Sequence, residues 1–595
     1  MDKSNQLRVK SFEPTLIQIE IVDFNKWKQE NSSEDIKIGS FLKVEDGNEN
    51  CILTLVKSFK MVEKNNVDSI SIQNDYEGSF IVDTQPIGQL VKNGDEIEFK
   101  KGIRHISIPP NGVSVASKEE LKKVFSYSCD SQICFSSHLI DNNIDVDMDG
   151  NKLFSKHIAV VGSTGSGKSC TVAKIIQEAK KSEHGKLNNT HVLIFDIHGE
   201  YQRAFPDANY LSIEDGNFKL PYWLMNSEEL EDMFIESQES NSHNQVSQFK
   251  LAVIENKKKY NPNIYVTYDS PVYFSINEVY EYILNKNNET HYKKNGKSYY
   301  AVTDSNIETS ETDVLWSKMK FEVSTGSAKH GILSEKVYKA GFNGEFDRFV
   351  SRLETKLNDE RLNFILSEYK DDSNKYSTND LNAILSRILG YDHKQNISII
   401  DLSSLPFEVV SIVVSIISRL IFDFSYYKIR STGNNNTPYM IVYEEAHKYV
   451  PKNNESKFKN TRIAVERIAK EGRKYGVSSM IVSQRPSELS STVFSQCNNF
   501  IVMRLTNPED QSYVKRLLPE AVVSYGDALS SLEQREALLV GDALSTPCIV
   551  NIKNASPTPK SDDIKFYSEW QQVWKDVDFN SISGLINKRR GIISD

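Results

Sequence analysis

The chain has 595 residues, too many for one hydrophobic core, so we expect two to four domains. Its formal net charge of −10 argues against a generally basic nucleic-acid coat, although a local basic channel inside an acidic exterior is compatible with it. Because the N-terminus lacks the apolar core of a signal peptide and the most apolar segment, 409–422, is interrupted by serines and Arg419, we expect a cytoplasmic protein without a membrane span.

Short β-rich segments occupy the first part of the chain, from about residue 15 to residue 108. They read LIQIEIVDF, CILTLVKSF, SFIVDT and DEIEFK, and Asp, Asn and Gly residues separate them. The segment Pro109-Pro110-Asn111-Gly112 follows and reads as a linker. This pattern predicts a small β-barrel over residues 1–110.

Residues 162–169 read GSTGSGKS and lie between an apolar segment, 157–161, and a helix-like segment, 170–180. They match the pattern G-x-x-x-x-G-K-[ST], whose glycines let backbone N–H groups turn inward and bind phosphates at a helix N-terminus. Lys168 would reach the β- and γ-phosphates, and the Ser169 hydroxyl would bind Mg²⁺. The alternative is a surface loop rich in glycine and serine. The predicted nucleotide-binding residues are Gly162, Ser163, Thr164, Gly165, Ser166, Gly167, Lys168, Ser169 and Cys170.

Further apolar segments follow, and most are separated by helical patterns. They read HVLIFD (191–196), ISIIDL (397–402), YMIVYE (439–444), SSMIVS (478–483) and NFIVMRL (499–505). Continuous apolar segments of this length are typical of a parallel sheet that is buried on both faces, which predicts an α/β fold.

About 200 residues separate the first two of these segments, which is too many for one crossover connection. Amphipathic patterns at 344–357 and 380–389 predict that this part is a mostly helical insertion. Within it, residues 285–313 are polar and aperiodic, so we expect an exposed loop there rather than a site.

Two acidic residues, Glu444 and Glu445, follow the apolar segment that begins at Tyr439. Phosphoryl chemistry needs one carboxylate for the Mg²⁺ shell and one that orients the attacking water. We assign Glu444 to the metal and Glu445 to the water. Gln484 leaves the end of the next segment, where a neutral amide could report the γ-phosphate through a hydrogen bond.

A helical pattern at 462–474 precedes the apolar segment 478–483 and carries several cations. Either these residues form a solvated basic face, or an arginine reaches the γ-phosphate of a neighbouring subunit. The cations are Arg467, Lys470, Arg473 and Lys474.

Taken together, these motifs resemble those of the HerA-like hexameric ATPases, which are relatives of the FtsK DNA pumps. The resemblance spans residues 158–552 and rests on several separate blocks in family order. These blocks are GSTGSGKSCTV, FDIHGEY, LPYWLMNSEEL, DRFVSRLETKLND, IIDLSSLPFEV, and the long block from Ile468 to Arg516.

The resemblance implies an α/β fold with a RecA-like P-loop ATPase core in two parts, 111–215 and 396–556. A mostly helical insertion, 216–395, would separate the two parts, with a small β-barrel at 1–110 and a tail at 557–595. It also implies a homo-hexameric ring that binds ATP and Mg²⁺ at subunit interfaces and threads DNA through a central pore.

For the site, the resemblance supports the assigned roles of Lys168, Ser169, Glu445 and Gln484, and it favours Arg473 as the residue that acts on the neighbouring subunit. One position departs from the family pattern, because Glu444 stands where the family usually has an aspartate. The extra methylene moves this carboxylate outward, so ATP turnover could be slow. Cations that could line a pore are Lys448, Lys452, Lys457, Lys459 and His198.

Two functions therefore remain open from the sequence. The first is an ATP-hydrolysing DNA translocase or helicase that works with a separate nuclease. The second is an ATPase ring that acts as a scaffold and regulator of a Sir2-like or nuclease effector subunit in antiviral defence. A membrane-anchored coupling ATPase is disfavoured, because the sequence offers no membrane span.

Overall fold

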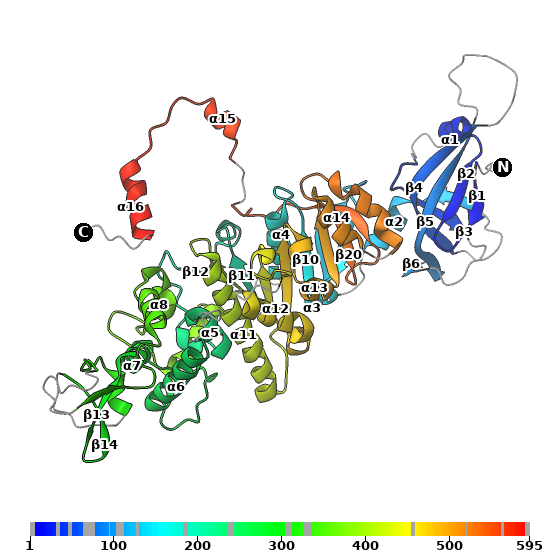
Figure 1. Ribbon diagram of the computed structural model, residues 1–595. Coiled ribbons are helices and arrows are strands. Elements are labelled where there is room, and N and C mark those ends of the chain that lie inside the picture. Colours follow the sequence, from blue (N-terminus) through cyan, green and yellow to red (C-terminus); the bar gives the residue numbers. More distant parts are fainter. Residues whose placement is uncertain are drawn as a thin grey trace.

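Figure 1 shows the computed structural model, in which the N-terminal sheet lies at one end, a large sheet with its helices lies in the middle, and a mostly helical part lies at the other end. The structure describes residues 6–30, 36–45, 50–63, 78–93, 96–102, 112–126, 130–181, 188–235, 242–303, 312–324, 336–453, 458–518, 520–560 and 564–589.

The N-terminal sheet is antiparallel and curled. Its strands follow the order β1-β2-β5-β4-β3-β7, and β6 pairs with β5. The two edge strands, β1 and β7, contact each other, so the sheet has the barrel-like form that the β-rich pattern predicts. Alternate residues such as Ile17 and Ile19 of β2, and Leu42 and Val44 of β3, fill its interior. The elements are β1 Leu7–Phe12, β2 Ile17–Ile21, α1 Phe24–Glu30, β3 Phe41–Glu45, β4 Cys51–Glu63, β5 Gly78–Asn93, β6 Glu96–Lys101 and β7 Gly112–Val115.

The central sheet has the order β12-β16-β11-β17-β18-β10-β19-β20-β21-β8-β9. From β12 to β19 in that order all neighbours are parallel, and from β19 to β9 all are antiparallel. The predicted apolar segments form its parallel part. The strands are β8 Gln132–His138, β9 Asp145–Asp149, β10 Ile158–Val161, β11 Val192–Asp196, β12 Asn209–Ser212, β16 Ile397–Asp401, β17 Tyr439–Tyr443, β18 Val477–Ser483, β19 Asn499–Met503, β20 Glu536–Gly541 and β21 Cys548–Ile552.

Both faces of the parallel part are buried. Along β10, Ala159 and Val161 belong to one hydrophobic cluster, whereas Ile158 and Val160 belong to the other. This alternation explains why the strand sequences are apolar at every position, and it confirms the predicted α/β fold. The surrounding helices are α2 Lys118–Phe125, α3 Gly150–Ser155, α4 Lys168–Lys180, α11 Phe407–Thr432, α12 Lys459–Glu471, α13 Ser491–Ser495 and α14 Pro508–Lys515.

The part between β12 and β16 is mostly helical, as the amphipathic patterns predict, but it also holds a small sheet of order β14-β13-β15. The most amphipathic predicted segments form α8 and α10. The elements are α5 Ser227–Phe234, α6 Ser242–Tyr260, α7 Ile276–Asn288, β13 Thr290–Lys294, β14 Lys297–Tyr300, β15 Val337–Lys339, α8 Asp347–Leu357, α9 Asn363–Leu366 and α10 Leu381–Ile388.

The prediction of an exposed loop at 285–313 is wrong for most of its described residues. Asn285 lies in α7, is fully buried, and donates from Nδ2 to the backbone oxygens of Leu315 (2.8 Å) and Ser317 (2.7 Å). The residues that follow form the hairpin of β13 and β14. The polar composition misled the prediction, because asparagine side chains can satisfy buried backbone groups. Residues 304–311 lie outside the described part of the chain.

One smaller difference concerns the end of a helix. The helix α12 ends at Glu471, and Arg473 and Lys474 lie in a 3₁₀ turn, η8 Gly472–Tyr475, rather than on the predicted helix.

The C-terminal tail has two helices, α15 Phe566–Trp570 and α16 Phe579–Arg589, which Figure 1 shows away from the body. None of the helices in the described ranges has both the length and the apolar character needed to cross a membrane.

Candidate functional site

The predicted phosphate loop lies between the end of β10 and the start of α4, and β10 is flanked by the parallel strands β18 and β19. Gly165 and Gly167 have φ angles of 72° and 102°, which residues with a side chain rarely adopt. A Cβ at Gly162 would lie 2.6 Å from Ser166 Oγ, so this position has no room for a side chain. The glycines are therefore required by the shape of the loop.

Neighbouring strands hold this loop in place through backbone hydrogen bonds. The Gly162 N–H donates to the Ser483 carbonyl (3.2 Å), and the Ser163 N–H donates to the Arg504 carbonyl (2.8 Å). On the other side, the Arg535 N–H donates to the Ser166 carbonyl (2.9 Å). These hydrogen bonds fix the shape of the loop, which lowers the entropic cost of binding a phosphate.

Lys168 is buried in the first turn of α4, and its Nζ donates to the Ser163 carbonyl at 3.2 Å. Burial lowers the pKa of Lys168, while the nearby carboxylates of Glu445, Glu444 and Glu200 act to raise it. The ammonium group therefore lies among three acids at the helix N-terminus, where an incoming phosphate can replace the loop carbonyl as its partner.

A chain of side-chain hydrogen bonds joins the phosphate loop to the second acid after β17. Thr164 Oγ1 donates to Gln484 Oε1 at 2.5 Å, and Gln484 Nε2 donates to Glu445 Oε1. Gln484 follows the last residue of β18, and Glu445 lies two residues after β17 ends. Because β17 and β18 are parallel neighbours, their carboxyl ends bring these residues to the same edge as the loop.

Glu445 has a strained backbone and one oxygen that is not hydrogen-bonded. Its φ and ψ of 47° and 41° place it in the left-handed region, which is uncommon for residues other than glycine and clusters at functional sites. Among the described residues, no donor hydrogen-bonds to its buried Oε2, which lies 3.4 Å from His447 Nδ1. This oxygen can accept a hydrogen bond from a water molecule, as a general base requires.

His447 was not predicted as a site residue, although it lies beside Glu445. Its Nδ1 is 3.1 Å from Ser483 Oγ, on the last residue of β18. Burial lowers the pKa of His447, which favours the neutral ring in spite of the neighbouring Glu445. The His447 imidazole thus connects the ends of β17 and β18 beside the Glu445 carboxylate.

Glu444 is directed toward the neighbouring strand β11. Its Oε2 accepts a hydrogen bond from the Ile197 N–H at 3.2 Å. Burial raises the pKa of Glu444 well above its usual range, and the nearby Asp196, Glu200 and Glu445 carboxylates raise it further. Burial also raises the pKa of Asp196, whose side chain interacts with Glu444. The two acids can therefore share one proton while no cation is bound.

These residues fit a nucleotide with Mg²⁺. The loop N–H groups and the Lys168 ammonium are groups that hold phosphates, and the Ser169 hydroxyl and the Glu444 carboxylate are ligand types that Mg²⁺ accepts. In the described part of the chain, no group of three or more His, Cys, Asp and Glu side chains could hold a metal ion alone. Mg²⁺ that binds with a nucleotide usually takes one or two protein ligands and fills its shell with phosphate oxygens and water.

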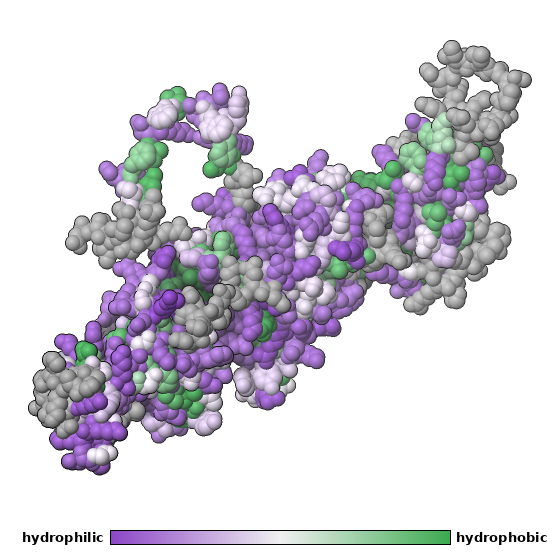
Figure 2. Space-filling model, viewed as in Figure 1, coloured by the Kyte–Doolittle hydropathy of each residue, from purple (hydrophilic) through white to green (hydrophobic). Residues whose placement is uncertain are grey.

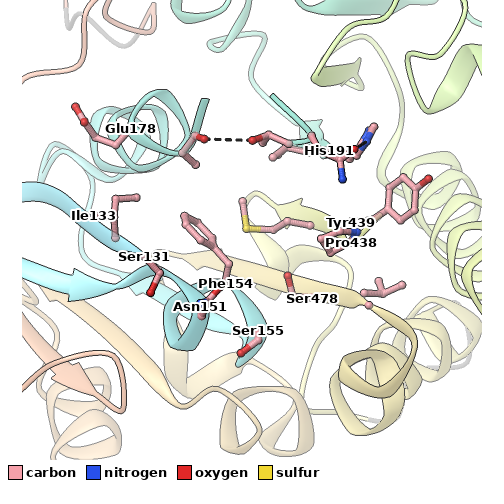
Figure 3. Close-up of a pocket in the computed structure, with 18 of the residues that line it drawn as sticks. Ser131, Ile133, Asn151, Phe154, Ser155, Glu178, His191, Pro438, Tyr439 and Ser478 are labelled. Atoms are coloured by element: carbon pink, nitrogen blue, oxygen red, sulfur yellow. Dashed lines mark hydrogen bonds between the residues drawn. The ribbon is translucent and has the colours of Figure 1, made fainter. Parts of the chain in front are cut away.

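Arg473 lies at the opposite edge of the sheet from its own phosphate loop. It borders a cavity of about 490 Å³ at the amino ends of β11, β17 and β18. Figure 3 shows other residues of this cavity, including Asn151, Phe154 and His191. Since β18 rises about 3.3 Å per residue over its length, Arg473 is on the order of 20 Å from the loop of the same subunit.

Comparisons with known proteins agree with this geometry. A family model described as the central domain of the helicase HerA matches residues 133–421. A probable helicase of Methanocaldococcus jannaschii is 27% identical over 492 residues, which are 82% of this chain and 80% of the relative. The DNA double-strand break repair helicase HerA of Sulfolobus acidocaldarius is also 27% identical, over 84% of this chain and 89% of its own length.

The chain is therefore similar to HerA helicases over most of its length. Among solved structures, VirB4 of Thermoanaerobacter pseudethanolicus matches with a TM-score of 0.45 and 14% identity, covering 72% of this chain and 98% of that protein. Each of the two matches to a helicase covers more than three quarters of both chains.

In this ATPase core, sequence reasoning identified the residues that follow β10, β17 and β18, but it missed Asp196 and Arg535. Asp196 ends β11 and could have been found, because an acid at the end of a strand next to β17 is an obvious partner for Glu444. Arg535 belongs to no motif. Its side chain packs against the phosphate loop, since a Cβ at Gly167 would lie 3.1 Å from Arg535 Cγ.

The cations that were predicted to contact DNA stay a prediction. Lys448 and Lys452 lie between β17 and α12, Lys459 begins α12, and His198 is exposed just after β11. Lys457 lies outside the residues that the structure describes.

Proposed function

We propose that this protein is an ATP-hydrolysing DNA translocase or helicase that works as a homo-hexameric ring with a separate nuclease or other effector subunit. The observation that carries the proposal is the hydrogen-bonded chain from Thr164 through Gln484 to Glu445. It links the loop that would hold the γ-phosphate to the carboxylate that would activate water. The DNA substrate follows from relatives that are named as DNA double-strand break repair helicases.

In this proposal, each side chain has one role. The loop N–H groups and Lys168 bind the phosphates, and Ser169 and Glu444 hold the Mg²⁺ shell. Glu445 accepts a proton from the attacking water through its Oε2, and Gln484 contacts the γ-phosphate. Bound Mg²⁺ supplies charge that offsets the negative charge developing on the phosphate oxygens.

The position of Arg473 supports a composite site between subunits. Arg473 is too far from the phosphate loop of its own subunit to act there. In a ring, it could instead lie beside the γ-phosphate that is bound to the neighbouring subunit. The C-terminal tail supports self-association, because large apolar side chains are exposed along it and such surfaces mark interaction sites. These side chains include Phe566, Trp570, Trp574 and Phe579.

A second candidate is a ring that regulates a Sir2-like or nuclease effector in antiviral defence. It is favoured by Glu444, which stands where the family usually has an aspartate and whose Oε2 already accepts a hydrogen bond from the Ile197 N–H. Slow turnover suits a ring whose nucleotide state controls a partner better than one that must move along DNA. The two candidates differ in whether the isolated ring translocates.

The ATPase site is tested by steady-state hydrolysis of purified variants. Lys168→Ala and Glu445→Gln should each lower kcat for ATP hydrolysis by roughly a hundredfold or more, because each removes a group that acts in the transition state. Glu445→Gln should still bind ATP. Wild-type hydrolysis should rise when duplex DNA is added. Full hydrolysis by Lys168→Ala would remove the assignment of the site.

A further inference from the structure

The small sheet of the insertion is basic, although the whole chain is acidic. Strands β13, β14 and β15 read THYKK, KSYY and VYK, which contain four lysines and no acidic residue. Lys336 precedes β15. Figure 1 shows β13 and β14 at the end of the molecule opposite the N-terminal sheet, and Figure 2 shows a mostly hydrophilic surface at that end.

The hairpin of β13 and β14 projects beyond the third strand. β15 pairs only with residues 290–292 of β13, so residues 293–298 form a two-stranded tip that reads KKNGKS. At the tip, Asn295 and Gly296 have φ angles of 51° and 77°, as a two-residue turn of the I′ type requires. The turn fixes the register of the strands, so the side chains of the tip have defined positions.

The tip carries lysines on both of its faces. Lys294 lies opposite Lys297 on one face, and Lys293 lies opposite Ser298 on the other. Like charges that face each other across a sheet are destabilising. Within the described residues neither Lys293 nor Lys297 makes an ion pair, and these two lysines lie on opposite faces of the tip.

The acid closest in sequence to the tip is already neutralised. Glu289 is buried and pairs with Lys286 at 2.8 Å and with His291 Nε2 at 2.5 Å. Beside it lies a shallow hollow of about 430 Å³, whose lining includes Glu289 together with Lys286, His291, Lys293, Tyr338 and Lys339. Since Lys286 and His291 pair with Glu289, the exposed lysines of this hollow are Lys293 and Lys339.

We propose that this hairpin tip inserts into the major groove of duplex DNA and contacts phosphates on both sides of the groove. The major groove admits a two-stranded β-ribbon, and lysines on both faces of such a ribbon match the phosphates of the two strands. The contact would be independent of sequence, because lysine to phosphate contacts carry no base readout. This inference rests on the proposed DNA function and assigns the contact to the small sheet of the insertion.

The test compares full-length variants by fluorescence anisotropy with a labelled duplex and with a single strand of equal length. The triple variant Lys293→Glu, Lys294→Glu, Lys297→Glu should bind the duplex at least about tenfold more weakly. It should also reduce the slope of log affinity against log salt by about 2 to 3. Replacing the same three lysines by arginine should preserve duplex affinity, and hydrolysis without DNA should be unchanged.

A matched control carries the same charge change at the other end of the molecule. Lys10, Lys26 and Lys28 are exposed on β1 and α1, and changing all three to glutamate should leave duplex affinity within about threefold of the wild type. Equal losses in both triple variants, or a loss for single strands as large as that for duplex, would overturn the groove contact. If the wild type itself neither binds DNA nor responds to it, the proposed function fails as well.

Discussion

Thr164, Gln484 and Glu445 form the smallest unit on which the proposed chemistry depends. The amide of Gln484 accepts a hydrogen bond from the phosphate loop and donates one to the carboxylate. In the proposed mechanism, a γ-phosphate in the loop would compete for Thr164 and for the amide. The state of Glu445 would then be coupled to the presence of the phosphate through a single side chain.

This coupling predicts a graded series of rates. Gln484→Ala removes both hydrogen bonds and should lower kcat for ATP hydrolysis by roughly a hundredfold, with a smaller change in KM. Thr164→Val removes only the hydroxyl donor and should lower kcat by about three- to tenfold. Thr164→Ser retains that donor and should stay near the wild type. Equal kcat values for Thr164→Val and Thr164→Ser in steady-state assays would argue against a role of this hydrogen bond.

At this scale, the sequence predicted the residues but not all of their contacts. Lys168, Glu445 and Gln484 could be found because each follows an apolar segment whose strand end is fixed by the sheet. The contact of Glu444 with Ile197 and the position of His447 depend on side-chain directions and on strand order, which a motif does not encode. Arg473 lies far from the phosphate loop of its own subunit, and its role in a neighbouring subunit stays a prediction.

Among the elements, the start of β10 depends on a buried histidine. His157 has a φ of 39°, and its Nδ1 accepts a hydrogen bond from the Ser479 N–H of β18 at 3.0 Å. Burial lowers the pKa of His157 to about 4, and nearby Arg473 lowers it too. The folded protein thus needs the neutral ring, whereas an unfolded chain can take up a proton near pH 6.5.

The sign of the resulting pH dependence follows from proton linkage. Between pH 6.5 and pH 4 the unfolded state binds more protons at His157 than the folded state does, so the free energy of unfolding falls as the pH falls. Between pH 7.5 and 5.5 this one group accounts for a loss of roughly 1 kcal/mol.

The variant His157→Asn should remove that contribution, because asparagine keeps an acceptor for the Ser479 N–H, tolerates the positive φ and does not titrate. Urea unfolding at the two pH values measures the difference. The exposed His393 provides the control, since His393→Asn should leave the wild-type pH dependence intact. A His157→Asn protein that loses as much stability as the wild type would contradict the linkage.

Element prediction succeeded where the pattern was apolar and failed where it was polar. The strands β11, β16, β17, β18 and β19 were found because both faces of each are buried. The hairpin of β13 and β14 was missed, because its lysines and asparagines resemble a solvated loop while tyrosines such as Tyr292 and Tyr300 are buried. Strands β20 and β21 were not predicted, and they extend the sheet in the antiparallel sense beyond β19.

For the whole molecule, the distance between Arg473 and its own phosphate loop predicts complementation between subunits. Arg473→Ala and Glu445→Gln should each be inactive alone, because each damages one half of every interface site. In a mixture, an Arg473→Ala subunit contributes an intact Glu445, and an adjacent Glu445→Gln subunit contributes an intact Arg473. Some interfaces then become complete, so ATP hydrolysis should recover.

The matched control mixes two variants that damage the same half of the site. Lys168→Ala and Glu445→Gln both affect the loop side, so no mixture of them should recover hydrolysis. Titrating one variant against the other at constant total concentration measures the effect. Absence of recovery for Arg473→Ala with Glu445→Gln at every ratio would remove Arg473 from the proposed interface.

The central claim is that ATP hydrolysis at this site moves the protein along DNA, and displacement of a third strand from a duplex tests it most directly. With ATP and Mg²⁺, the wild type should displace a triplex-forming strand, whereas ADP, or the Glu445→Gln variant with ATP, should not. A wild-type protein that binds the duplex and hydrolyses ATP but leaves the third strand in place would contradict the claim. That result would favour the ring that regulates an effector.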